Sequence, residues 1–149
     1  MKATIMLCDA VQVAAGKFFI LGGGWSFIGP EPIPSALAVK IDIDWNEIES
    51  NHHWELFLSD EDGVPFTIPT PEGDQPVEVR GDFEAGRVEG AIPGSSISLP
   101  LAINIPPLPL EEGKRYVWRL VIDGETHEDW AVAFSVRSAE DEINESGPY

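Results

Sequence analysis

Residues 116–123 read YVWRLVID and show the clearest two-residue alternation in the chain. In an extended strand, Tyr116 and Trp118 share one face, while the residues between them face the opposite way. A polar turn around Gly124 follows, and residues 130–136 then repeat the alternation. Two alternating runs joined by a short turn that contains glycine predict an antiparallel hairpin.

Similar short runs recur along the chain, bounded by Gly, Pro or acidic clusters, and each predicts a half-buried strand. They cover residues 37–43, 54–58, 77–84 and 97–105. Within the last run, Pro100 cannot donate a backbone hydrogen bond, which predicts an edge strand or a bulge. Residues 2–8 and 17–21 are mostly apolar on either side of a turn at residues 15–16, so they predict a buried hairpin.

The 14 Gly and 13 Pro residues are spread through the sequence and would interrupt any long helix. A single turn within residues 46–50 is the one helix we expect. The whole pattern predicts an all-β protein, an immunoglobulin-like antiparallel β-sandwich of about seven to nine strands. We expect one domain over residues 1–137, followed by an acidic, disordered tail at residues 138–149.

Charge excludes several classes of function. The chain has 26 Asp and Glu against 9 Lys and Arg, a formal net charge of -17, which repels nucleic acids and anionic membranes. The single cysteine, Cys8, leaves no internal disulfide framework and no zinc site built from several thiolates. We found neither a signal peptide nor an apolar stretch long enough to span a membrane, so we expect a cytoplasmic protein. The oligomeric state does not follow from the sequence.

Two resemblances to known proteins support the predicted fold and domain organisation. Residues 113–120, GKRYVWRL, together with residues 130–136, resemble the last two strands of immunoglobulin-like sandwiches, where a glycine before an aromatic residue turns the corner into the penultimate strand. Residues 1–10, 16–26 and 122–130 are similar to a bacterial family of short, uncharacterised proteins. That resemblance implies a single-domain protein and brings no known catalytic residue, cofactor or partner.

Histidines and carboxylates suggest metal binding, but their spacing argues against it. His52 and His53 are adjacent, so in a strand they point to opposite faces and only one could join a given site. His127 could supply a second ligand, with Glu125, Glu128 or Asp129 as a third, but no His-Glu-x-x-His motif is present. We therefore predict no metal site among these histidines and no cofactor. Acidic clusters at loops leave calcium binding open as an alternative. These clusters are Asp42, Asp44 and Glu47; Asp60, Glu61 and Asp62; and Asp123, Glu125, Glu128 and Asp129.

No catalytic residue stands out, so we predict that the protein is not an enzyme. Cys8 has no neighbouring base in the sequence, and no Gly-x-Ser-x-Gly motif is present. The glycines at residues 22–24 lack the Lys-Ser or Lys-Thr of a phosphate loop and instead predict a bend or a bulge.

Tryptophans supply the candidate binding residues. Trp54, Trp118 and Trp130 fall on the apolar faces of predicted strands and are expected in the core. Trp25 and Trp45 lie beside bends, where an exposed ring could anchor a protein partner or stack on a sugar. We therefore predict a non-enzymatic module that binds another protein, with a carbohydrate-binding sandwich or a calcium-dependent binding domain as alternatives.

Overall fold

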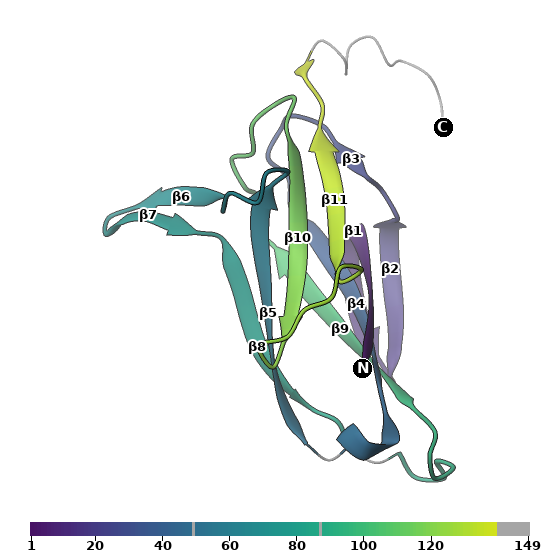
Figure 1. Ribbon diagram of the computed structural model, residues 1–149. Helices are drawn as coiled ribbons and strands as arrows, with labels where there is room; N and C mark the ends of the chain where they lie inside the picture. Colours follow the sequence, from purple (N-terminus) through teal and green to yellow (C-terminus); the bar gives the residue numbers. More distant parts are fainter. Residues whose placement is uncertain (49, 87, 140–149) are drawn as a thin grey trace.

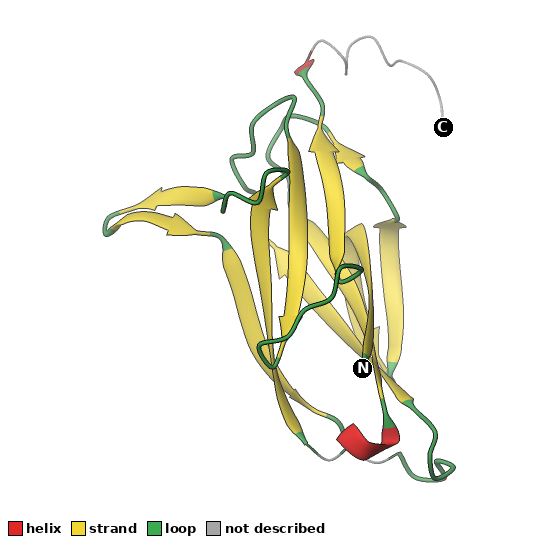
Figure 2. Ribbon diagram, viewed as in Figure 1, coloured by secondary structure: helices red, strands yellow, loops and turns green. Residues whose placement is uncertain are grey.

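The computed structural model describes residues 1–48, 50–86 and 88–139, and it confirms the predicted all-β sandwich (Figures 1 and 2). One sheet has the order β2-β1-β4-β9, and its strands are β1 (Lys2–Ala14), β2 (Lys17–Gly23), β4 (Ser35–Ile43) and β9 (Ile97–Ile105). The other has the order β3-β11-β10-β5-β8, and its strands are β3 (Phe27–Ile28), β5 (Asn51–Asp60), β8 (Glu78–Glu84), β10 (Arg115–Ile122) and β11 (Ala131–Val136). Neighbouring strands are antiparallel except β3 and β11, which are parallel.

The core lies between the two sheets and follows the alternation of the strands. In β10, Tyr116, Trp118, Leu120 and Ile122 are all buried, as the sequence predicts. They meet the alternate apolar residues of β4 and β5 in one continuous cluster, which also contains Trp54 and Trp130. Each large buried side chain contributes about 1.5–3 kcal/mol of transfer free energy, so this cluster is the main stabilising element of the sandwich.

The predicted C-terminal hairpin is confirmed, because β10 and β11 pair from Arg115 opposite Ser135 to Arg119 opposite Ala131. At the start of β10, the Glu111 backbone N–H donates a hydrogen bond of 3.0 Å to the hydroxyl of Tyr116. A tyrosine at this corner that bonds to the backbone a few residues upstream is a feature of immunoglobulin-like sandwiches. The bond fixes the loop that leads into β10.

Two smaller predictions concern Pro100 and the single helical turn. Pro100 lies in β9, which is the edge strand of its sheet, so its missing N–H interrupts no ladder in the sheet interior. The helical turn is η1 (Trp45–Glu47), one residue earlier than the start of the predicted segment. Figure 2 shows it in red at one end of the sandwich.

The N-terminal hairpin is correctly predicted in its turn, and its predicted burial holds for Ala3, Leu7 and Cys8 of β1 but is wrong for β2. Ala15 and Gly16 both have positive φ, 51° and 71°, as a two-residue hairpin turn requires. However, β1 pairs with β4 only as far as Cys8, and beyond that point its described partner is β2. The outer part of the hairpin therefore has no sheet neighbour on its far side, and most residues of β2 are exposed.

Two further segments lie outside the packed sheets. The strands β6 (Thr67–Thr70) and β7 (Gly73–Pro76) form a hairpin that projects away from the sandwich (Figure 1). The predicted disordered tail falls almost wholly outside the described residues, which end at residue 139. Within the described part of the chain, no helix has the length and apolar character needed to span a membrane.

Candidate interaction edge

Sheet edges expose unpaired backbone groups, and three of the four edge strands in the described sandwich carry features that discourage pairing. Strand β8 alternates charged residues along its length: Glu78, Arg80, Asp82 and Glu84. Strand β9 contains Pro100, and β3 is two residues long. Charges, prolines and short length are the usual ways in which proteins prevent strands of other chains from adding to an edge.

The fourth edge strand, β2, has none of these features, and neither has the stretch of β1 at residues 10–14, which lies beyond the part of β1 that pairs with β4. Strand β2 is seven residues long, contains no proline, and has one charged residue, Lys17. Its Phe19 and Leu21 side chains are 58% and 71% exposed. Residues 10–30 around it contain no Asp or Glu, and neither do residues 90–110, in a chain that has 26 of these residues. A long, apolar and uncharged edge is the kind that pairs with another strand.

The turn determines which backbone N–H and C=O groups of β2 bond to β1 and which point to the open side of the sheet. A two-residue turn makes Ala14 and Lys17, its flanking residues, a hydrogen-bonded pair. Hydrogen-bonded and non-bonded pairs alternate along antiparallel strands, so Phe19, opposite Gln12, also bonds to β1. The N–H and C=O groups of Phe18 and Ile20 therefore point to the open side of the sheet.

The side chains of β2 form a hollow on one face and an anchor on the other. Phe19 lies opposite Gln12 and Leu21 opposite Ala10, and cross-strand partners share a face. A hollow of about 420 Å³ lies on the hairpin, lined by Ala10, Val11, Gln12, Phe19, Ile20 and Leu21. Phe18 packs instead against a small buried cluster that includes Cys8 and Val11. The hairpin is thus held to the sandwich while Phe19 and Leu21 remain accessible.

The far end of β2 bends at glycines, as the sequence predicts. Gly22 and Gly24 have φ values of 59° and 87°, which favour glycine over other residues. The Gly24 N–H donates a hydrogen bond of 2.7 Å to the carbonyl of Leu7, so the chain stays attached to β1 as it turns towards Trp25.

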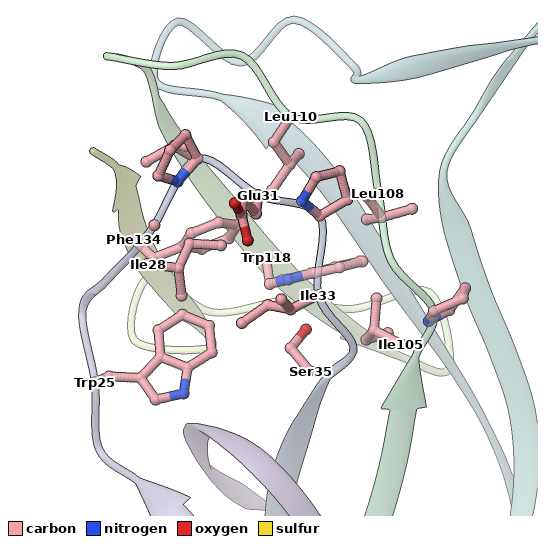
Figure 3. A pocket seen from close by; sticks show the side chains of 15 residues that line it. Trp25, Ile28, Glu31, Ile33, Ser35, Ile105, Leu108, Leu110, Trp118 and Phe134 are labelled. Atoms are coloured by element: carbon pink, nitrogen blue, oxygen red, sulfur yellow. The ribbon is translucent and has the colours of Figure 1, made fainter. Parts of the chain in front are cut away.

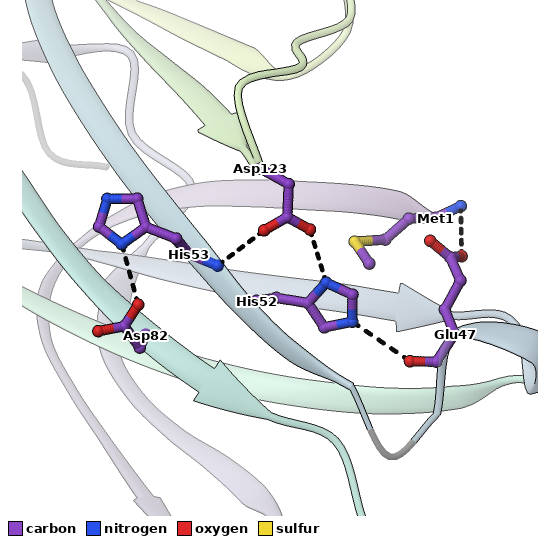
Figure 4. A network of polar contacts seen from close by, with 6 residues as sticks. All are labelled: Met1, Glu47, His52, His53, Asp82 and Asp123. Atoms are coloured by element: carbon purple, nitrogen blue, oxygen red, sulfur yellow. Dashed lines mark hydrogen bonds and ion pairs between the residues drawn. The ribbon is translucent and has the colours of Figure 1, made fainter.

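The histidines occupy structural positions rather than a common site (Figure 4). His52 is 7% exposed, and its Nδ1 lies 2.6 Å from Oδ2 of Asp123 while its Nε2 lies 3.2 Å from the carbonyl oxygen of Glu47. The backbone N–H of His53 donates to the second oxygen of Asp123, and its ring contacts Asp82. His127 packs against Trp130. In the described ranges, no three His, Cys, Asp or Glu residues are grouped so that they could hold a metal ion.

Both ring nitrogens of His52 face oxygen atoms that can only accept hydrogen bonds, a carboxylate and a carbonyl. Both are satisfied only when the ring carries two protons and a positive charge. Burial alone would lower the pKa of His52, but the hydrogen bond and the charge of Asp123 outweigh it and raise the pKa. Burial likewise opposes ionisation of Asp123, yet the bonds from His52 and His53 hold its pKa below the usual range. The pair therefore links β5 to the turn after β10 by a charged hydrogen bond.

The two predicted tryptophan sites are both half-buried, and Trp25 lies in the segment between β2 and β3, whereas Trp45 lies after β4. Trp25 packs edge-on against Phe134, with ring centres 5.9 Å apart. Its buried indole N–H has no partner among the described residues, and it lies beside a pocket lined also by Ile33 and Leu110 (Figure 3). The pocket volume is about 20 Å³, enough for a water molecule and too small for a sugar ring. Trp45 lies in η1 and packs against the main core.

The acidic clusters that suggest calcium binding lie in separate turns. Asp42 accepts a hydrogen bond from Ser98 and pairs with Lys40. Asp60 accepts bonds from the backbone N–H groups of residues 62 and 64. Asp60 is opposite Tyr116 in the sheet, whereas Trp54 is opposite Ile122, so Asp60 and Asp123 lie at opposite ends of the β5–β10 pair. The calcium and carbohydrate alternatives stay predictions.

Comparison with known proteins identifies the family of the chain. The model of DUF6941, a family of unknown function, matches residues 3–144. The chain belongs to this family. No curated protein and no solved structure matches it. The predicted resemblance to an uncharacterised family is thereby confirmed, while its bacterial origin and the immunoglobulin-like strand pattern stay predictions.

Sequence reasoning missed Phe19 and Leu21 as candidate binding residues of this DUF6941 protein. The run FFIL at residues 18–21 is apolar at every position, so its periodicity does not distinguish a buried strand from an exposed edge. The absence of acidic residues between Asp9 and Glu31 was the available signal. Residues 90–110 are equally free of acids, so this signal does not by itself single out β2.

Proposed function

We propose that this DUF6941 protein is a non-enzymatic interaction module that binds another protein by adding an extended strand to β2. The observation that carries the proposal is the contrast between the edges: β8, β9 and β3 are protected by charge, proline or short length, and β2 exposes Phe19 and Leu21. Strand addition to an open sheet edge is a common mode of protein recognition.

The backbone groups of β2 would contribute affinity for a partner strand, and its side chains would contribute specificity. The open N–H and C=O groups of Phe18 and Ile20 would bond to the backbone of any extended partner strand. Phe19, Leu21 and the hollow beside them would select apolar side chains at alternate positions of that strand. The partner segment should therefore be extended, apolar at every second residue and free of proline where it faces Ile20.

The remaining surface narrows the class of partner. A net charge of -17 opposes binding to nucleic acids and anionic membranes, which we do not expect as partners. We place the protein in the cytoplasm, where thiols stay reduced. This location is compatible with Cys8, which is fully buried and whose pKa is raised by burial and by the nearby Asp9.

The non-enzymatic assignment is supported by the state of the histidines. Both ring nitrogens of His52 are engaged by Asp123 and Glu47, and the ring stacks on Phe83. A histidine held in this way has no free nitrogen to exchange a proton with a substrate. It serves the fold rather than a reaction.

The proposal is tested by placing a photo-crosslinking amino acid at position 21 and, as a matched control, at position 92. Ile92 is 73% exposed and Leu21 is 71% exposed, so the two positions present similar side chains to solvent on different parts of the surface. We expect protein adducts from position 21 in cells that make the chain, with the crosslinked peptides identified by mass spectrometry. Adducts in equal yield from both positions, or none from position 21, would contradict the proposal.

A further inference from the structure

We propose that the strand added to β2 is β2 of a second copy of the chain. The two strands would run antiparallel about a two-fold axis that passes between the two Ile20 residues. This inference rests on the proposed function, because it requires that β2 be a pairing edge. It goes further in naming the occupant and the register.

The sequence of β2 is compatible with pairing to itself. In an antiparallel register centred on Ile20, Phe19 of each copy lies opposite Leu21 of the other. These two residues are the most exposed apolar side chains of the strand, and cross-strand aromatic and aliphatic pairs stabilise antiparallel sheets. The symmetry forms this pair twice, so each copy covers both of its exposed side chains and the hollow that they line.

The backbone agrees with the same register. In this register Ile20 opposite its own copy is a hydrogen-bonded pair, because the open backbone groups of the two residues face each other. The hairpin turn at residues 15–16 leaves the N–H and C=O groups of Ile20 on the open side, where they can form that pair. A register shifted by one residue would place Ile20 opposite Phe19 or Leu21 of the second copy, whose backbone groups bond to β1, and would lose these bonds.

The local charge of β2 permits a second copy at this one surface. Lys17 lies opposite Gly23 of the second copy, so the two lysines stand at opposite ends of the paired strands, about 20 Å apart. No carboxylate lies in residues 10–30, so the strand pair itself brings no acids together. Elsewhere two chains of charge -17 repel each other. Salt should therefore strengthen self-association by screening this repulsion, whereas it would weaken binding to a basic partner.

The expected dimer is reversible. A single pair of seven-residue strands covers less than the roughly 800 Å² per partner that is usual for a stable interface. Monomer and dimer should therefore exchange with concentration, so the test needs a concentration series rather than one measurement.

Sedimentation equilibrium of the full chain between about 5 and 500 μM provides that test. We expect the average mass to rise from 16.3 kDa towards twice that value, and to rise at lower concentration when salt is increased. Leu21→Lys removes two buried leucines per dimer and introduces charge at the centre, so it should weaken association by about a hundredfold or more. Ile92→Lys, the same change at an equally exposed position, should leave association unchanged.

Circular dichroism melts establish that each variant is folded. Ile20→Pro is a second variant that removes the N–H on the open side and should also abolish association. A wild-type chain that stays monomeric over the whole range, or a Leu21→Lys variant that associates as the wild type does, would overturn the second copy as occupant. The proposed function would survive that result if position 21 still crosslinked to a different protein, so the two failures can be told apart.

Discussion

The carboxylate of Asp9 lies in the space that a side chain on Gly22 would occupy, across the hairpin from β1 to β2. Gly22 also has a φ of 59°, a conformation that residues with a Cβ rarely adopt. The glycine is therefore required twice at this position, once by the backbone and once by its neighbour. The close approach of Asp9 leaves no room for a side chain at this end of β2.

Gly22→Ala should destabilise the protein by more than the cost of the backbone conformation alone, which is about 1–2 kcal/mol. Gly24→Ala is the matched control, because Gly24 has a φ of 87° but no atom within 4 Å of an added Cβ. Urea unfolding should give a larger loss of free energy for Gly22→Ala. Equal losses would show that Asp9 moves away without cost.

Gly81 gives a second test of close packing, in this case beneath Trp54. A Cβ at Gly81 would lie 2.9 Å from Cζ2 of Trp54, whose ring is buried in the core. Gly81→Ala should destabilise the protein by about 1–3 kcal/mol, as overpacking does, and should change the near-ultraviolet circular dichroism of the tryptophans. Gly86→Ala, where no atom lies within 4 Å, should do neither. An unchanged melting temperature for Gly81→Ala would contradict the packing of Trp54 on this glycine.

The pair formed by His52 and Asp123 predicts a specific dependence of stability on pH. The pKa of His52 is raised above 6.5, so its contribution is complete below about pH 6.5 and is lost as pH rises through the folded value. The pKa of Asp123 is lowered below 3.8, so its contribution is present above about pH 4 and is lost as pH falls through the folded value. The pair therefore stabilises the protein most between these limits.

Thermal melts between about pH 6 and pH 8 provide the measurement. The wild type should lose stability across this range, and His52→Gln should lose less while being destabilised at pH 6 by about 1–3 kcal/mol. His53→Gln is the comparison variant, because it replaces the neighbouring, half-buried histidine that pairs with Asp82 and leaves the contact of His52 with Asp123 in place. Parallel curves for the wild type and His52→Gln would show that the buried ring does not titrate as its contacts imply.

The sequence predicts the sandwich well where alternation is strict. Tyr116 and Trp118 alternate with polar or β-branched residues, so their faces can be assigned without a structure, and Pro100 similarly identifies an edge. The contact of His52 with Asp123 could not be predicted, because it joins residues 71 positions apart through a sheet register that local patterns do not determine. The exposure of Phe19 was missed for a related reason. Whether an apolar hairpin is buried depends on how far the neighbouring strand extends. Here β4 does not extend past Cys8 of β1, so it does not cover the outer part of the hairpin.

The burial of Trp25 could not be predicted from its position beside a bend. The bend beside it was correctly predicted, but a bend does not determine whether the following ring points outward or onto the core. In the structure Trp25 packs on Phe134, which lies more than a hundred positions along the chain. The roles predicted for Trp25 and Trp45 in binding remain to be tested, and alanine substitutions at these positions should leave association through β2 unchanged.

Hydrogen exchange at the amides of β2, followed by nuclear magnetic resonance, tests the central role of this edge most directly. We expect the amides of Phe18 and Ile20 to exchange slowly in concentrated protein, where a second strand covers them, and rapidly on dilution. The amide of Phe19, which bonds to β1, should change little. Rapid exchange of Phe18 and Ile20 at every concentration, with Phe19 protected, would contradict pairing of this strand with another copy.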